Sequence, residues 1–415
     1  MEKETRNRIQ RATQAARELL EHEYAEQLEG VFDIRLDGTV ESEPGEHLDP
    51  AQRVLRRKLV TAIEHQQASG MKMADAVSAH LREAAFTTLN RFVALKMLEA
   101  RELVQECISR GDQSAGFKEF AGLAPGLVQL SDHGYRIYIE SLFDEIGREV
   151  RVLFDRRDPV SLLWPRRQTL VDLLGVLNST ELDSVWAEDE TIGWVYQYFN
   201  SDEERKQMRA ESQAPRNSRE LAVRNQFFTP RYVVQFLADN TLGRIWYEMR
   251  QGDTQLRDLD YLVRNTDESF LSEGQIPPRS EGGDGSSGET DASEPILVPF
   301  RAKKDPRDIR VLDPACGSGH FLLYAFDLLQ TIYCEAWEDE SSPESEVTAR
   351  TLRQDYPDIG SLSAAVPSLI LRHNLHGIDI DTRAAQIAAL AMWMRAQRGF
   401  KDSGTARGDR PAIQK

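Results

Sequence analysis

Cysteine is scarce in this chain of 415 residues, and long hydrophobic runs do not occur. The cysteines are Cys107, Cys316 and Cys334, which stand at no metal-ligand spacing, so we expect neither a disulfide scaffold nor a bound metal. No run of about 18 apolar residues could cross a bilayer. The first residues, Met1–Arg6, also lack the apolar segment of a signal peptide. These absences predict a cytoplasmic protein without membrane contact.

Positive charge is also in deficit, because 51 Lys and Arg face 68 Asp and Glu, for a net charge of −17. Binding of nucleic acid over the whole surface would need the opposite sign, so any such contact must be local. A local basic cluster does exist. We favour its interpretation as a solvated face paired with nearby acids, and contact with a DNA backbone is the alternative. Its members are Arg151, Arg156, Arg157, Arg166 and Arg167.

The length of the chain predicts more than one domain. Residues 1–200 contain long apolar-periodic stretches, above all at 72–106, and predict a mainly helical domain. Residues 192–199 are dense in aromatics, which indicates a packed domain interface, with base stacking as the alternative. Residues 201–415 form the second expected domain. Within it, the Gly- and Ser-rich residues 273–294 cannot bury a core and predict a flexible insertion.

The most informative stretch lies at residues 309–323. An apolar strand at 309–312 delivers Asp313 at its carboxyl end, Gly317 and Gly319 follow, and a helix is expected from about His320. Strand, glycine loop and helix N-terminus together cradle a nucleotide-like ligand in α/β proteins. The loop reads neither Gly-x-Gly-x-x-Gly nor Gly-Lys-Thr, so dinucleotide and triphosphate sites are poor matches. An acid before the glycines suits a ligand with a cationic end, such as S-adenosylmethionine (AdoMet).

Two further segments flank this loop in the sequence. Thr229 is a good helix N-cap with Pro230 at the first helical position, and an amphipathic helix is expected to run to about Met249. Phe228 before the cap is either part of an apolar wall or a hydrophobic staple. On the other side, an apolar strand from His376 ends in acids.

Asp379 at the end of that strand is a candidate ribose-hydroxyl acceptor, and Asp381 is a candidate cap for a helix over 382–398. Plain capping and turn roles are the alternative for both acids. The ribose acid normally follows the glycine loop by about 20 residues. Asp379 stands much further on, which predicts an insertion over residues 337–371.

Residues 313–322, Asp-Pro-Ala-Cys-Gly-Ser-Gly-His-Phe-Leu, closely resemble the AdoMet motif of adenine-N6 DNA methyltransferases. The order of Phe228-Thr229-Pro230, glycine motif and Asp379 is that of the γ arrangement. Together with the helical amino-terminal part and residues 193–199, it is similar to the large methylases of phage-defence systems. These are the PglX proteins of BREX and the DISARM methylases, of which DISARM is preferred.

The resemblance implies an α/β fold with a mainly helical N-terminal domain, followed by an incomplete Rossmann-like AdoMet-dependent methyltransferase domain. It implies that the chain binds AdoMet, acts on double-stranded DNA and works with other defence-system proteins. Asp313 would meet the α-ammonium of AdoMet, Asp379 the ribose, and Phe321 and Ile380 the adenine. The implied cofactor-binding residues are Phe228, Thr229, Asp313, Ala315, Gly317, Gly319, Phe321, Asp379 and Ile380.

The sequence lacks one element of that family. The family presents its flipped adenine with Asn/Asp/Ser-Pro-Pro followed by an aromatic residue, whereas the only Pro-Pro here is Pro277-Pro278, between Ile276 and Arg279. We therefore assign no catalytic residue and interpret the chain as the amino-terminal part of such a methylase. We expect that it does not methylate DNA alone. The alternative is a non-catalytic AdoMet-binding or assembly module of a defence complex.

Overall fold

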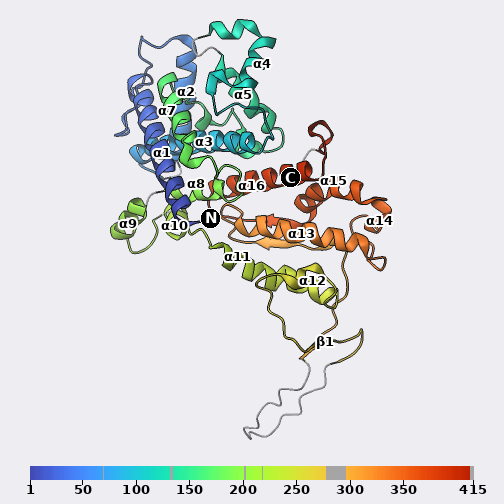
Figure 1. The fold of residues 1–415 in the computed structure, drawn as a ribbon. Coiled ribbons are helices and arrows are strands. Elements are labelled where there is room, and N and C mark those ends of the chain that lie inside the picture. Colours follow the sequence, from blue (N-terminus) through green and yellow to red (C-terminus); the bar gives the residue numbers. More distant parts are fainter. Residues whose placement is uncertain (69, 131–133, 201, 217, 277–295, 412–415) are drawn as a thin grey trace. The chain divides into compact units, whose positions relative to one another are not determined.

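A computed structural model describes residues 1–68, 70–130, 134–200, 202–216, 218–276 and 296–411 (Figure 1). The chain divides into two compact units. The first comprises Met1–Phe228 with Ile380–Met394, and the second comprises Thr229–Asp379 with Arg395–Lys415. The domain boundary expected after residue 200 stays a prediction. Most of the expected insertion at 273–294, including Pro277-Pro278, lies outside the described residues.

The first unit is helical, as expected from its apolar periodicity. Its long central helix is α3, and α1 contacts α3, α7 and α8. The α-helices of this unit are α1 (Lys3–Gly30), α2 (Pro50–Ala68), α3 (Met73–Ala100), α4 (Ala115–Leu123), α5 (Tyr135–Ile146), α6 (Arg151–Phe154), α7 (Arg167–Leu177), α8 (Thr191–Phe199), α9 (Asp202–Glu211) and α10 (Ser218–Asn225). Helix α16 (Thr382–Asp402) begins in this unit.

Helix α3 is the core of this unit because its sequence is apolar on nearly every side, which suits a helix surrounded by others. Its residues from Ala84 to Leu98 are all buried. Phe92 packs edge-on against Phe143 of α5, at 6.2 Å between ring centroids. The expected core helix within 72–106 is confirmed as one continuous helix.

The second unit begins with α11 (Arg231–Ala238), a π-helical turn (Asp239–Gly243) and α12 (Arg244–Met249). The expected amphipathic helix therefore reaches Met249, but its start differs from the prediction. Pro230, not Thr229, is the N-cap, and no side chain caps this end. Pro230 has an extended ψ of 142° with the φ of −57° that its ring allows, so the first helical residue is Arg231.

Two short parallel ladders lie in the second unit. Strand β1 (Glu268–Phe270) pairs with β2 (Ile296–Val298), and β3 (Val311–Asp313) pairs with β4 (Leu375–Gly377). Helix α13 (His320–Glu338) packs against both β3 and β4. The predicted insertion over 337–371 contains α14 (Leu352–Asp355) and α15 (Ile359–Leu369), and a second π-helical turn (Ile370–Asn374) leads into β4.

Buried polar groups fix the second ladder to its surroundings. The fully buried Asn374 donates from Nδ2 to the carbonyls of Pro306 and Ile309, at 2.6 and 2.8 Å, and accepts from the Tyr333 hydroxyl at 3.0 Å. Leu312 of β3 is 57% exposed, in contrast to the buried Leu375 of β4. The described chain is thus mostly helical with a few short parallel strands, which is compatible with an α/β class.

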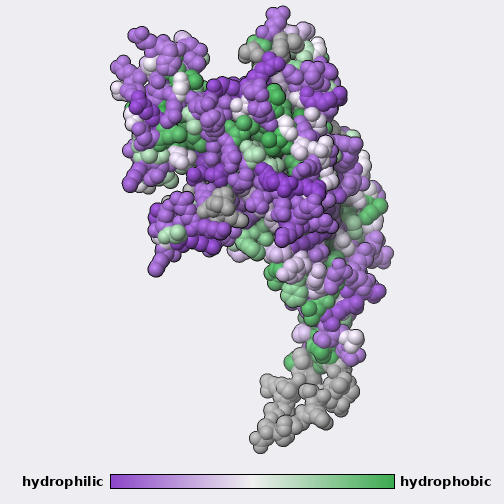
Figure 2. Space-filling model, turned by 60° about the vertical axis from the view of Figure 1, so that its left-hand side comes forward, coloured by the Kyte–Doolittle hydropathy of each residue, from purple (hydrophilic) through white to green (hydrophobic). Residues whose placement is uncertain are grey.

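The face drawn in Figure 2 is mostly hydrophilic, with smaller hydrophobic patches. This agrees with a composition in which 29% of residues are charged. Among the described residues, no helix is long and apolar enough to cross a membrane.

Candidate functional site

The candidate site is built at the carboxyl ends of β3 and β4. In the ladder, Asp313 stands opposite Gly377, and the Ile378 N–H continues the pairing by donating to the Asp313 carbonyl at 2.9 Å. The strand places Asp313 at the edge where ligands of open α/β sheets bind. Gly377 allows this close pairing, because a Cβ there would meet Cys316 Sγ and Leu322 Cδ1 at 3.0 Å.

The loop after β3 turns sharply into α13 through its two glycines. Gly317 has φ of +52° and Gly319 has φ of +88°, both in the left-handed region that favours glycine. The Gly319 N–H donates to the Cys316 carbonyl, and the Leu323 N–H donates back to the Gly319 carbonyl, each at 2.8 Å. Strand, glycine loop and a helix starting at His320 are therefore present, as predicted, but the strand is Val311–Asp313 and not 309–312, so Asp313 is its last residue.

Asp379 joins the glycine loop although it is 62 residues further along the chain. Its Oδ2 accepts from the Gly317 N–H at 2.8 Å, and the Cys316 N–H donates to the Ile378 carbonyl at 3.0 Å. The unusually long spacing is thus accommodated by the intervening helices, which return β4 to the side of β3. Asp381 accepts from the Arg383 N–H at 3.0 Å, so its predicted capping role at α16 is confirmed.

The Asp313 carboxyl has one satisfied and one unsatisfied oxygen. Oδ1 accepts from the Ala315 N–H at 3.1 Å, whereas Oδ2 is buried and has no hydrogen-bond partner among the described residues. Burial raises the pKa of this carboxyl, and the nearby Asp379 raises it further. A buried acceptor without a donor is costly, so the position favours a ligand that brings a cationic donor.

The loop also leaves room for a ligand. A Cβ built on Gly317 would meet nothing within 4 Å, so the loop backbone is open on that side. Ala315 is exposed, and Phe321 is half-buried in the first turn of α13. The Cys316 thiol is not a nucleophile at neutral pH, because burial followed by the charges of Asp379 and Asp313 raises its pKa to about 11.

The structure brings together five of the nine residues predicted to bind the cofactor. Asp313, Ala315, Gly317 and Gly319 lie at the end of β3 and in the glycine loop, and Asp379 contacts this loop from beyond β4. Phe321 follows on α13. Thr229 belongs to the same unit and immediately precedes Pro230 and α11. Phe228 and Ile380 belong to the first unit. The cofactor roles of all nine stay predictions.

In the first unit, the aromatic helix α8 is a packing element. Trp194 and Tyr196 are buried, and Phe228 packs on Trp194 with 4.1 Å between ring centroids. The Tyr196 hydroxyl donates to Asp381 Oδ2 at 3.0 Å. Trp194 and Tyr196 are therefore packed within the first unit, which disfavours base stacking for these two rings. That the stretch packs a domain interface stays a prediction.

The arginine cluster is paired with acids, which was the favoured interpretation. Asp155 binds both Arg151 and Arg157 at 3.0 Å, and Arg166 binds Glu23 at 2.7 Å. Arg156 pairs with Glu140 and Asp144, and Arg167 stands 4.0 Å from Asp112.

Sequence reasoning missed a buried acid close to the start of α13. Asp239 is fully buried in the π-helical turn after α11 and accepts from the Tyr324 hydroxyl at 2.8 Å. Burial raises the pKa of this carboxyl. An acid between Ala238 and Leu242, on the apolar side of an amphipathic helix, was the signal that could have revealed it.

The strand, the glycine loop and the helix N-terminus form the kind of site that binds nucleotide-like ligands in α/β proteins. Comparison with known families points to the same segment of the chain. Residues 297–406 match the family described as "MmeI, DNA-methyltransferase domain". This range contains β3, the glycine loop, α13 and β4 with Asp379, so the matched segment is the one that builds the candidate site.

Individual relatives are adenine-specific methyltransferases. The chain is 32% identical over 244 residues to the adenine-specific methyltransferase BrxX of Escherichia coli O9:H4 (strain HS). This alignment covers 58% of this chain and 16% of that protein. It is 24% identical over 380 residues to the adenine-specific methyltransferase PglX of Lacticaseibacillus casei (strain Zhang), covering 84% and 28%.

A putative type II restriction enzyme and methyltransferase of Methanocaldococcus jannaschii is 26% identical over 186 residues, covering 44% of this chain and 13% of that protein. The alignments thus span less than a third of the length of each of these curated relatives. They confirm the resemblance to PglX-like adenine methyltransferases of BREX systems. None of these three relatives is named a DISARM methylase, so they do not support the preference for that group.

Proposed function

We propose that this chain is the AdoMet-binding part of an adenine-N6 DNA methyltransferase that marks host DNA in a phage-defence system. The observation that carries the proposal is the buried Asp313 Oδ2, which has no hydrogen-bond partner in the described part of the chain, beside an open glycine loop. The match of the same segment to a DNA-methyltransferase domain supports it. Double-stranded DNA would be the substrate, other defence proteins the partners, and the cytoplasm the place of action.

Different residues of the loop would contact different parts of AdoMet. The Asp313 carboxylate would accept from the α-ammonium of AdoMet, and the left-handed glycines would let the backbone approach the methionine portion closely. Asp379 would accept from the ribose hydroxyls while it holds the loop through the Gly317 N–H. Phe321 and Ile380 would pack at the adenine, and Phe228 and Thr229 would complete the methionine side.

AdoMet supplies an electrophilic methyl group on its sulfonium. The chain's own contribution is to hold that donor in one orientation, since positioning lowers the barrier of a two-reactant step. Presentation of the adenine requires the Asn-Pro-Pro-aromatic element of the family, which these 415 residues do not contain. The proposal for this chain is therefore donor binding, and it includes the expectation that the chain alone does not methylate DNA.

We also propose that the second unit represents part of a Rossmann-like methyltransferase domain spanning residues 201–415. The parallel pairing of β3 and β4 with α13 packed on both strands supports this assignment. The 57% exposure of Leu312, an apolar residue in the middle of β3, is what an unfinished sheet would leave.

Calorimetric titration with AdoMet tests the proposal, using Asp313→Asn as the variant. Loss of one charge-assisted hydrogen bond should weaken AdoMet binding about tenfold to hundredfold. 5′-Methylthioadenosine has the same nucleoside but no ammonium, so its affinity should not change. Glu338→Gln, at the opposite end of α13, is the matched control and should bind AdoMet normally.

Two results would contradict this assignment. One is a wild-type chain that does not bind AdoMet although it is folded, as a cooperative unfolding transition would show. The other is an Asp313→Asn variant that loses AdoMet and 5′-methylthioadenosine to the same extent, because the carboxylate would then not recognise the ammonium.

A further inference from the structure

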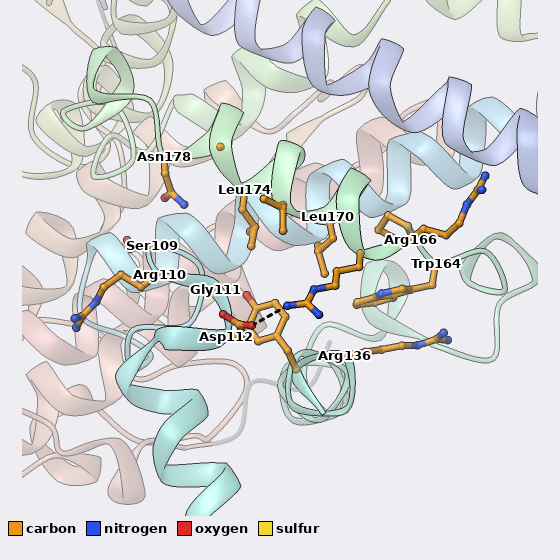
Figure 3. A pocket seen from close by; sticks show the side chains of 15 residues that line it. Ser109, Arg110, Gly111, Asp112, Arg136, Trp164, Arg166, Leu170, Leu174 and Asn178 are labelled. Carbon is orange, nitrogen blue, oxygen red and sulfur yellow. Dashed lines mark ion pairs between the residues drawn. The ribbon is translucent and has the colours of Figure 1, made fainter. Parts of the chain in front are cut away.

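The first unit contains a large pocket that the proposed methyl-donor site does not involve. Its volume is about 770 Å³, within the range of small-ligand sites. The pocket runs along α7, and Figure 3 shows the side chains that line it. It is built from the loop at Ser109–Asp112, the start of α5, residues 164–166 and α7 with Asn178.

The body of the pocket is apolar. Leu170 and Leu174 are nearly buried and lie one helical turn apart on α7, with the buried Tyr135 among the other lining residues. Gly111 allows its loop to come close to α7, because a Cβ there would meet Leu174 Cδ1 at 3.1 Å. Such walls suit a flat or apolar ligand body.

Positive charge dominates the lining. Four of the lining residues are arginines, and Asp112 is the one carboxylate among them. Three arginines bind carboxylates outside the lining: Arg110 binds Glu106, Arg136 binds Glu140, and Arg166 binds Glu23 and Glu26. Arg167 differs, because its ion pair with Asp112 lies within the lining and spans 4.0 Å.

Arg167 is therefore the cation best placed to exchange its partner for a ligand. It stands at the start of α7, and the dashed line at Asp112 in Figure 3 marks its ion pair. An exposed pair at this distance contributes little free energy, so a phosphate could replace Asp112 at small cost. The indole of Trp164 lies near the same end and is braced by the Arg136 guanidinium, 5.1 Å from the ring centroid.

The opposite end of the pocket offers a free acceptor. Asn178 donates from Nδ2 to the Ile108 carbonyl at 3.0 Å, whereas its Oδ1 is buried without a hydrogen-bond partner among the described residues. A buried amide oxygen in this state favours a ligand that brings an N–H donor. From Arg167 to Asn178 the helix rises about 16 Å, so one elongated ligand could meet both ends.

We propose that this pocket binds a nucleoside di- or triphosphate whose base carries an exocyclic amino group. The phosphates lie at Arg167, the base rests on Leu170 and Leu174, and the amino group donates to Asn178 Oδ1. The site is separate from AdoMet binding and goes beyond the function proposed above.

The test is calorimetric titration of the 415-residue chain with ATP, in the presence of saturating S-adenosylhomocysteine to fill any adenosine site on the glycine loop. ATP should bind saturably, and adenosine or inorganic phosphate alone much more weakly. Arg167→Gln should weaken ATP binding about tenfold, whereas Asp112→Asn should strengthen it by removing a like charge.

Asn178→Leu, which removes the acceptor at similar size, should weaken ATP more than inosine triphosphate, which has no exocyclic amino group. Arg151→Gln is the matched control, since Arg151 belongs to the same arginine cluster but does not line the pocket. The proposal is wrong if the cooperatively folded chain does not bind ATP, or if Arg167→Gln and Arg151→Gln change ATP binding equally. Binding of phosphate as tight as that of ATP would also overturn it.

Discussion

At the scale of single residues, the candidate site rests on Asp313 and the two glycines after it. The sequence made these residues recognisable, because an acid at a strand end and glycines before a helix form a local pattern. What the sequence could not reveal is that, among the residues that the structure describes, Asp313 Oδ2 has no donor while Oδ1 is satisfied. That asymmetry depends on the path of the backbone through Ala315 and is visible only in three dimensions.

Gly317→Ala should abolish AdoMet binding while the chain remains folded. The methyl group would enter the open space above the loop, which the ligand needs. Gly404→Ala is a matched control, because Gly404 also has a positive φ, of +75°, and open space around its Cβ position. Each change should lower the free energy of unfolding by about 1 kcal/mol, measured by urea denaturation. Equal AdoMet affinities of the two variants would show that the loop does not hold the ligand.

The raised pKa of Asp313 predicts how AdoMet binding depends on pH. An ammonium ligand binds the ionised carboxylate, so affinity should be full above the raised pKa and fall as the pH decreases through it. Without ligand the sign is reversed: burial penalises the ionised form, so this group favours folding below its ordinary pKa and loses that contribution as the pH rises. Titrations at a series of pH values descending from neutral should show the decline in wild type and a flatter profile in Asp313→Asn.

At the scale of secondary structure, the sequence predicted the elements well and their exact ends less well. The strand before Asp313, the helix from His320 and the cap at Asp381 follow from local patterns. The start of α11 was misjudged by one residue, because both Thr229 and Pro230 suit a helix start and sequence alone does not rank them. The contact of Asp379 with the glycine loop depends on the packing of α15 against α13. This is a long-range arrangement, and the spacing of the two segments in the sequence does not indicate it.

A buried acid ties α13 to α12 and to the segment after it. Glu335 is 5% exposed and accepts from Trp246 Nε1 and Thr254 Oγ1 at 2.7 Å, and from the Gln255 N–H at 2.6 Å.

Glu335→Ala would leave those donors buried without an acceptor and should lower the free energy of unfolding by about 3 kcal/mol or more. Glu338→Gln, on the exposed end of the same helix, should change it by less than about 0.5 kcal/mol. Urea denaturation measures both, and equal stabilities would contradict the role given to Glu335.

At the scale of the whole molecule, the sequence correctly indicated a helical amino-terminal region, through its apolar periodicity, and paired arginines, through its excess of acids. It gave no sign of the pocket along α7, because Ser109, Tyr135 and Asn178 come from segments far apart in the sequence. The matches to BrxX and PglX cover less than a third of each relative. Donor binding at the glycine loop is therefore the property proposed for this chain itself.

Hydrogen–deuterium exchange with and without AdoMet tests that claim most directly, because it locates the ligand on the chain. We predict slower exchange in peptides covering residues 313–323 and 376–381, and unchanged exchange in peptides covering residues 109–113 and 164–178. Saturating AdoMet that leaves 313–323 unprotected while protecting another region would contradict the account.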